Sequence, residues 1–220
     1  MIVGKTSTKL KKRGLVAAIA AGTVCTVALS YYMWTFPINS NFHEVVQGKI
    51  YRSGQPRLEQ LRSWINRYNI KTVINLRGTK APLAVEEAQL AKELNVRIVF
   101  CRLSAYKLIT VEELNELLNL LKESPQPILI HCRNGVDRAG TVSALAAWLV
   151  GGRDFETAER QLYIPPGPLK RRRFISPHIS DTVKMYESYC YRNKLDLNSV
   201  EQFDKWRRTV YSDYLRSLKK

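Results

Sequence analysis

The stretch of residues 127–141 constrains the fold of this 220-residue chain more than any other. It opens with an apolar run, Ile128–Ile130, of the kind that forms a buried strand. A short glycine-containing loop follows His131 and Cys132, and a helical pattern begins near Arg138. A strand, a tight loop and a helix start in this order aim backbone N–H groups and the positive end of a helix dipole at one point. The stretch therefore predicts an anion-binding loop.

The side chains that border this loop indicate its chemistry. Cys132 and Arg138 are separated by five residues. A thiol beside a helix N-terminus and a guanidinium ionises readily and becomes a nucleophile. Arg138 can hold two oxygens of a phosphoryl group at once, and backbone N–H groups can hold the others. The pattern predicts a thiolate that attacks phosphorus; the alternative is a buried structural cysteine followed by an unrelated arginine.

The order His131, Cys132, five residues, Arg138, between a strand and a helix, resembles the signature loop of the cysteine-dependent protein tyrosine and dual-specificity phosphatases. Residues 51–56 and 71–77 resemble the same family, bacterial dual-specificity-like members in particular, and the resemblance covers residues 44–192. It implies an α/β fold with a central, mostly parallel sheet flanked by helices. The loop is expected at the carboxyl end of a central strand, and no metal or organic cofactor is implied.

The resemblance also implies a reaction, the hydrolysis of phosphomonoesters through a phosphocysteine at Cys132. Arg138 is expected to bind the phosphate, and His131 to support the thiolate from behind. The residues expected to surround the phosphate are consecutive in the loop: Arg133, Asn134, Gly135, Val136, Asp137 and Arg138.

One departure from the family lies directly after the arginine. The family usually has Ser or Thr there, whose hydroxyl supports the thiolate and helps it leave the phosphocysteine, whereas this chain has Ala139. Thr141, two residues further on, is the candidate for a supporting hydroxyl. We therefore expect slow breakdown of the intermediate. A rival interpretation is a catalytically weak pseudophosphatase that acts as a phosphate-binding module.

A second departure concerns the general acid, which in this family is commonly an Asp on a separate loop. The matching stretch, residues 102–108, contains no carboxylate. Asp137 is the remaining candidate, and phosphoinositide phosphatases of the myotubularin and Sac types resemble this chain in having an Asp just before the arginine. The alternative for Asp137 is an ion pair or a hydrogen bond that stabilises the loop.

The N-terminus predicts a membrane segment. Residues 1–13 are basic and contain no acid, and residues 14–36 are uncharged and end in aromatic side chains. This length spans a bilayer, and the charge distribution predicts a signal anchor with a cytoplasmic N-terminus. The catalytic domain would then be exported from the inner or plasma membrane, into the periplasm in a bacterium. The alternative is a signal peptide cleaved after the small residues at 28–30.

The remaining boundaries follow from composition and periodicity. We predict a linker over residues 37–48, a phosphatase domain over 49–195 that opens with an edge strand, and a C-terminal amphipathic helix over 196–220. That helix docks on the domain or lies on a membrane or partner. Three titratable side chains are predicted on the surface: Glu86 and Glu87, on the exposed face of a helix, and His178.

The formal net charge of +16 favours anionic partners. The resemblance suggests a phosphoprotein as substrate, but an exported, anchored domain would more readily meet a lipid or sugar phosphate. The basic run 170–173 either binds a second phosphate or an anionic membrane, or is a solvated charge run. No nucleic-acid motif accompanies the charge, so nucleic acid is not an expected partner. The four cysteines have no metal-binding spacing.

Overall fold

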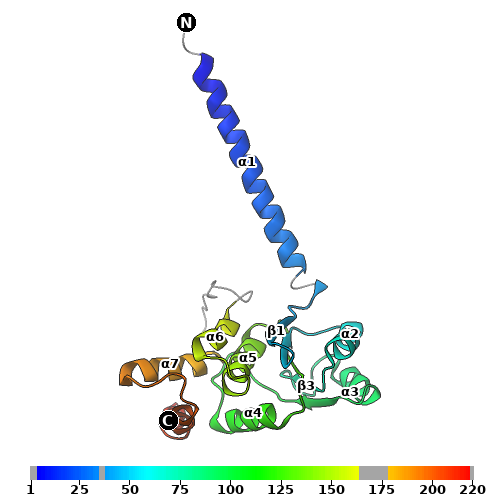
Figure 1. Cartoon of the computed structure of the whole chain (residues 1–220), viewed down its shortest axis with the longest axis vertical. Helices are drawn as coiled ribbons and strands as arrows, with labels where there is room; N and C mark the ends of the chain where they lie inside the picture. The colour runs from blue at the N-terminus through cyan, green and yellow to red at the C-terminus, as the bar shows by residue number, and fades with distance from the viewer. Residues whose placement is uncertain (1–3, 35–37, 164–177, 219–220) are drawn as a thin grey trace. The chain divides into compact units, whose positions relative to one another are not determined.

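The computed structural model describes residues 4–34, 38–163 and 178–218. It divides into two compact units, Met1–Asn39 and Ser40–Lys220 (Figure 1). The described part of the first unit is dominated by helix α1 (Gly4–Met33). Its apolar part, Arg13–Met33, has 21 residues, and at 1.5 Å per residue it is about 31 Å long. That length and composition suffice to cross a bilayer, and they fit a signal anchor and a cleavable signal sequence alike.

In the described part of the second unit, five strands form one sheet in the order β1-β2-β5-β3-β4. The β1–β2 pair is antiparallel and the other three pairs are parallel, so the predicted α/β class with a mostly parallel sheet is confirmed. The strand that precedes the signature loop, β5, lies at the centre. The strands are β1 (His43–Val46), β2 (Ile50–Ser53), β3 (Thr72–Asn75), β4 (Arg97–Phe100) and β5 (Ile128–His131).

Alternating side chains give the sheet two apolar faces, because successive residues of a strand point to opposite sides. In β5, Leu129 joins the core that α2 (Leu58–Tyr68) and α3 (Ala84–Glu93) cover. Ile128 and Ile130 join the core on the opposite face, together with α4 (Val111–Glu123) and α5 (Asp137–Leu149), and Figure 1 shows the two groups of helices on either side of the strands. The other described helices are α6 (Phe155–Glu159), the 3-10 turn η2 (Arg160–Leu162), α7 (Asp181–Asn193), α8 (Val200–Arg208) and α9 (Val210–Ser217).

The segment predicted as a linker contributes to the sheet. His43–Val46 is the antiparallel edge strand β1, so the strand that follows it, β2, is internal rather than the predicted edge. The Phe42 ring anchors the segment, with its centroid 4.3 Å from that of Trp64 and 5.1 Å from that of Tyr68. The segment is polar, and for this reason the sequence indicated a linker. Its ordered conformation comes from aromatic partners that are distant in the chain, so the linker prediction was wrong. The basic run 170–173 lies outside the described residues.

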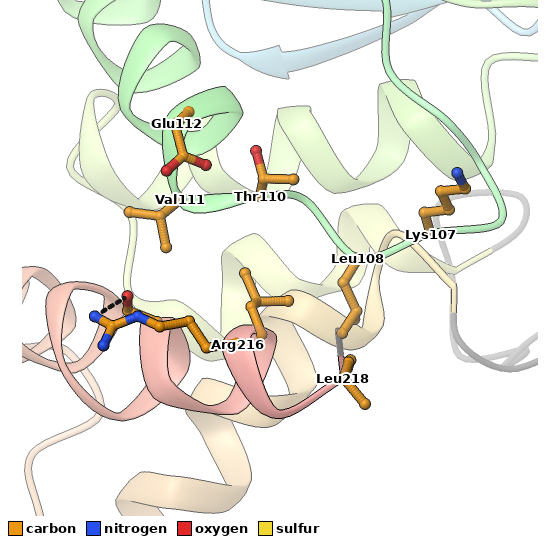
Figure 2. Close-up of a pocket in the computed structure, with 9 residues that line it drawn as sticks. Lys107, Leu108, Thr110, Val111, Glu112, Arg216 and Leu218 are labelled. Carbon is orange, nitrogen blue, oxygen red and sulfur yellow. Dashed lines mark hydrogen bonds between the residues drawn. The ribbon is translucent and has the colours of Figure 1, made fainter. Parts of the chain in front are cut away.

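The single helix predicted over residues 196–220 is two helices, α8 and α9, which meet at Thr209. Both pack on the rest of the second unit: the Phe203 centroid of α8 lies 5.1 Å from that of Trp148, and the Tyr211 hydroxyl of α9 donates to the carbonyl of Ile109 at 2.5 Å. An apolar pocket of about 290 Å³ lies between α9 and residues 107–112 (Figure 2). Of the alternatives considered for the C-terminal segment, docking on the domain is the one observed.

Trp206 provides a test of this docking. Its side chain is buried and surrounded by the rings of Tyr186, Phe203 and Tyr211. We expect Trp206→Ala to lower the free energy of unfolding by about 3–5 kcal/mol, measured by urea denaturation with circular dichroism. The control, Tyr214→Ala, removes a ring of the same segment that is 42% exposed, and should change it by less than about 0.5 kcal/mol. Equal losses in the two variants would contradict the docking.

Candidate active site

The loop of residues 132–136 joins the central strand β5 to α5 and packs directly on the turn after β2. Gly135 has a φ of +69°, and a Cβ at this position would lie 2.5 Å from the backbone nitrogen of Gly54. Both the left-handed conformation and the close approach require glycine. The loop therefore lies against the backbone of β2 at a distance that no larger residue permits.

The carbonyl oxygens of the loop are held on its outer side. The backbone N–H of Gln55 donates to the carbonyl of Arg133 at 3.0 Å. The Asn41 side chain donates from Nδ2 to the carbonyls of Asn134 and Gly135, both at 3.0 Å. In a trans peptide the N–H points opposite to the carbonyl, so the loop N–H groups face the other way. No described group accepts a hydrogen bond from the N–H groups of residues 133–136, which leaves them available to an anion.

These N–H groups face a cleft of about 760 Å³, to which Cys132, only 2% exposed, contributes its side chain. Two carboxylates, Glu113 and Asp137, line the described cleft. Burial, and next the charge of Arg138, lower the pKa of Arg77. The positive groups of the cleft are therefore close enough to repel one another, which favours a bound anion. Six cationic side chains line it: Arg77, Lys80, Arg102, Lys107, Arg133 and Arg138.

Arg138 lies in the first turn of α5 and is anchored by two backbone carbonyls. Its NH1 donates to the carbonyl of Leu76 at 3.3 Å and lies 3.5 Å from that of Leu103. Both contacts use one terminal nitrogen, and a guanidinium has five N–H donors. The remaining donors are thus available for oxygens of a phosphoryl group in the cleft.

Asp137 is the first residue of α5, and its Oδ1 lies 3.3 Å from Nε2 of His178. Since the N–H of Ser180 donates to Nδ1 of this imidazole at 3.4 Å, a neutral His178 carries its proton on Nε2 and can donate it to Asp137. The predicted surface position of His178 was wrong, because its side chain is 6% exposed. The non-helical residues before α7 pack on the cleft loop, where Ile179 donates to the carbonyl of Ala105.

His131 is fully buried, and its Nε2 lies 3.4 Å from Oε2 of Glu87, which is also fully buried. The predicted exposure of Glu87 was wrong. Adjacent helical residues point about 100° apart, so Glu86 is exposed while Glu87 turns toward the sheet. Burial alone would raise the pKa of Glu87, but the nearby His131 imidazole and the hydrogen bonds from Gln55 and Asn75 outweigh it and lower this pKa.

Residues 36–173 match the family model described as a DSP-PTPase phosphatase fused to NAD+ kinase, which is more than half of the chain. The chain belongs to this DSP-PTPase phosphatase family. A search of the curated proteins finds no match to it.

Three solved structures are similar to this DSP-PTPase chain. A variant of Tk-PTP is 18% identical, covers 70% of this chain and 97% of its own, and has a TM-score of 0.51; this likeness shows the fold. The core catalytic domain of the PP-IP phosphatase SIW14 from S. cerevisiae is 25% identical over 70% of this chain and 93% of its own, with a TM-score of 0.48. TpbA from P. aeruginosa in complex with pTyr is 22% identical over 56% and 72%, with a TM-score of 0.43.

The structure brings most of the predicted site residues of this DSP-PTPase to one place. Cys132, Arg133, Asn134, Asp137 and Arg138 line one cleft. The other predicted residues of this stretch, His131, Gly135 and Val136, are buried and do not line the cleft, and the same holds for Ala139. Thr141 is buried as well, and its hydroxyl donates to the carbonyl of Asp137 at 2.8 Å. Among the described residues, no cluster of His, Cys, Asp and Glu side chains is suited to a metal ion.

The structure adds residues that the sequence analysis did not assign to the site. Asn41 and His43 come from the predicted linker, and Glu87 from a helix face predicted to be solvated. Gln55 lies in the segment 51–56, which carries the family resemblance outside the loop, and it contacts Arg77. Arg77 is not new in this sense, because the resemblance of the segment 71–77 suggests that it lines the phosphate cleft, the alternative being a solvated strand-end arginine; it does line the cleft. That resemblance was the available signal for these two residues.

The pH dependence of stability tests the contact behind the loop. His43 Nε2 lies 2.7 Å from Oδ1 of Asn41, and burial, followed by the charge of Arg52, lowers the pKa of His43 to about 4. The unfolded chain, with a histidine pKa of about 6.5, binds more protons between these values. The contribution of neutral His43 to the free energy of unfolding is therefore complete above pH 6.5 and is lost as the pH falls to about 4.

We expect the free energy of unfolding of the wild type to fall by about 2–3 kcal/mol across this window because His43 must be protonated. In His43→Gln most of this fall should be absent. Chemical denaturation at several pH values measures both proteins, and parallel pH profiles would show that His43 is not the titrating group.

Proposed function

We propose that this chain hydrolyses phosphomonoesters in two steps, with Cys132 as the nucleophile. The observation that carries the proposal is the convergence, at one cleft, of the Cys132 thiol, the N–H groups of residues 133–136 and the Arg138 guanidinium. The thiolate of a cysteine is the form that attacks phosphorus, and an anion bound in this cleft meets several hydrogen-bond donors at once.

In the first step the Cys132 sulfur attacks phosphorus, an S–P bond forms, and the bond from phosphorus to the leaving oxygen breaks. The loop N–H groups and Arg138 hold the three other oxygens, whose charge they stabilise as the bonds rearrange. Asp137 supplies the proton that the leaving oxygen takes up.

Two facts favour Asp137 as this acid among the described carboxylates of the cleft. The other one, Glu113, accepts the N–H of Thr110 at 2.8 Å in the capping box of α4. Asp137 lies in the signature loop itself, directly before Arg138. The imidazole of His178, with Nε2 at 3.3 Å from Oδ1, holds the carboxyl group of Asp137 in place.

In the second step a water molecule attacks phosphorus, gives a proton to Asp137, and the S–P bond breaks to release phosphate and the thiolate. No hydroxyl follows Arg138 directly, since the residue there is the fully buried Ala139. The hydroxyl proton of Thr141 is used in the bond to the carbonyl of Asp137. We therefore propose that breakdown of the phosphocysteine limits turnover.

The proposed setting is a membrane. Helix α1 is long and apolar enough to span it, and a basic N-terminus is retained in the cytoplasm, so the catalytic domain would be exported. A domain anchored in this way acts on phosphates near the bilayer. We propose a lipid or sugar phosphate as substrate rather than a phosphoprotein, and a clear preference for a phosphotyrosine peptide over lipid phosphates in a substrate panel would contradict this.

Turnover by the full chain in detergent tests the mechanism. With p-nitrophenyl phosphate we expect vanadate-sensitive hydrolysis that Cys132→Ser lowers by roughly 10³-fold or more. Ala139→Ser should raise the steady-state rate, because it returns a hydroxyl to the position after Arg138. Asp137→Asn should lower the rate by about 10²-fold for an alkyl phosphate, and much less for p-nitrophenyl phosphate, whose leaving group needs no proton.

Two results would contradict the proposal. Full activity of Cys132→Ser would exclude the nucleophile. Vanadate binding to a wild type without turnover would indicate a phosphate-binding module instead. Asp137→Asn with an unchanged rate on alkyl phosphates would exclude the acid role alone.

A further inference from the structure

The most unusual side chain near the cleft is Glu87, a carboxylate with no exposed surface. It lies in α3 and accepts hydrogen bonds from two side-chain amides, Gln55 Nε2 and Asn75 Nδ2, the second at 2.7 Å. Its Oε2 also lies 3.4 Å from His131 Nε2. A charge is buried only where several partners replace water, so these four side chains form one unit.

One member of this unit, His131, lies next to the signature loop. His131 directly precedes Cys132, and its ring is fully buried. The described residues offer neither ring nitrogen a hydrogen bond within normal geometry. Oε2 of Glu87, 3.4 Å from Nε2, faces the ring, and its charge favours an imidazole orientation that keeps a proton on Nε2.

Two other members, Gln55 and Asn75, connect Glu87 to Arg77, which lines the cleft. The guanidinium of Arg77 donates from NH1 to Oε1 of Gln55 at 2.5 Å, and the same amide donates from Nε2 to Glu87. The backbone N–H of Arg77 donates to Oδ1 of Asn75 at 2.8 Å, and Asn75 also bonds Glu87. Both hydrogen bonds of Arg77 are thus made to side chains that are themselves bonded to the Glu87 carboxylate.

Arg77 needs these contacts to keep its guanidinium in the cleft. Burial, and next the charges of Arg138 and Arg133, lower its pKa, whereas the charge of Glu87 raises it, so the guanidinium lies among like charges. Like charges at short distance repel one another, and a free arginine side chain would move away into solvent. A neutral amide backed by a buried carboxylate holds the guanidinium in the cleft without an ion pair that would cancel its charge.

We propose that Glu87 is a positioning residue that acts on the phosphate site twice, orienting His131 beneath Cys132 and, through Gln55, holding Arg77 toward the phosphoryl oxygens. Arg77 is then a second phosphate-binding arginine beside Arg138. The inference rests on the proposed function, because it assigns these residues to the same bound phosphate.

The test uses the full chain in detergent, with kcat and KM for p-nitrophenyl phosphate and a calorimetric titration with inorganic phosphate. Arg77→Gln and Gln55→Leu should each raise KM and weaken phosphate binding by about tenfold to a hundredfold, with little change in kcat. In the double variant the two effects should not add, because both remove one contact. Glu87→Gln should weaken phosphate binding similarly and also lower kcat.

Two further variants separate positioning from stability. Glu86→Gln removes the neighbouring, exposed carboxylate of the same helix and should leave all values at those of the wild type. The exchange Glu87→Gln with Gln55→Glu restores an amide–carboxylate pair next to Arg77 but takes the charge away from His131. Because the carboxylate at position 55 would form an ion pair with Arg77 and cancel its charge, we expect both phosphate affinity and kcat to stay low in this variant, whatever its Tm.

The proposal is overturned if Arg77→Gln binds phosphate like the wild type, if the effects of Gln55→Leu and Arg77→Gln add, or if Glu87→Gln lowers Tm with kcat and KM unchanged. Failure of the proposed function looks different. In that case the wild type shows no Cys132-dependent turnover, while the phosphate titrations still decide whether Arg77 and Glu87 act together.

Discussion

The site depends on how the backbone of the signature loop is held against the turn after β2. Hydrogen bonds from Gln55 and Asn41 fix three loop carbonyls on the outer side, and the close approach of Gly135 to Gly54 leaves no room for the loop to turn over. The N–H groups consequently face the cleft. The parallel pairing of β2 with β5 brings the two segments together, since it ends both strands at the same edge of the sheet. The anion site is thus a product of sheet topology.

Charge is arranged in two layers around this backbone. Cationic side chains line the cleft, where a phosphate neutralises them, and the fully buried Glu87 lies behind it. Each layer would be unfavourable alone: the cations repel one another, and a buried carboxylate without donors is costly. The amide of Gln55 connects the layers, because it donates to Glu87 and accepts from Arg77. At the other end of the loop, His178 contacts the carboxylate of Asp137, which itself lines the cleft.

Features that depend on a local sequence pattern were predictable, and features that depend on partners distant in the chain were not. The order of β5, loop and α5 was predictable because each part has its own pattern: an apolar run, a glycine and a helical pattern that begins near Arg138. The same holds for the capping box at Thr110. The edge strand at His43, the buried Glu87 and the buried His178 were missed, because each is determined by partners far away in the chain. Periodicity indicates that one face of α3 is buried, but not that a carboxylate there would find three partners.

The central claim is that Cys132 carries the phosphoryl group during turnover, and rapid acid quenching during steady-state hydrolysis tests it most directly. Because Ala139 supplies no hydroxyl to release the sulfur, we expect mass spectrometry to find a phosphoryl group on the Cys132 peptide in most wild-type chains, and in far fewer chains of Ala139→Ser. A chain that hydrolyses substrate while Cys132 stays unmodified, or that carries the phosphoryl group on another residue, would contradict the account.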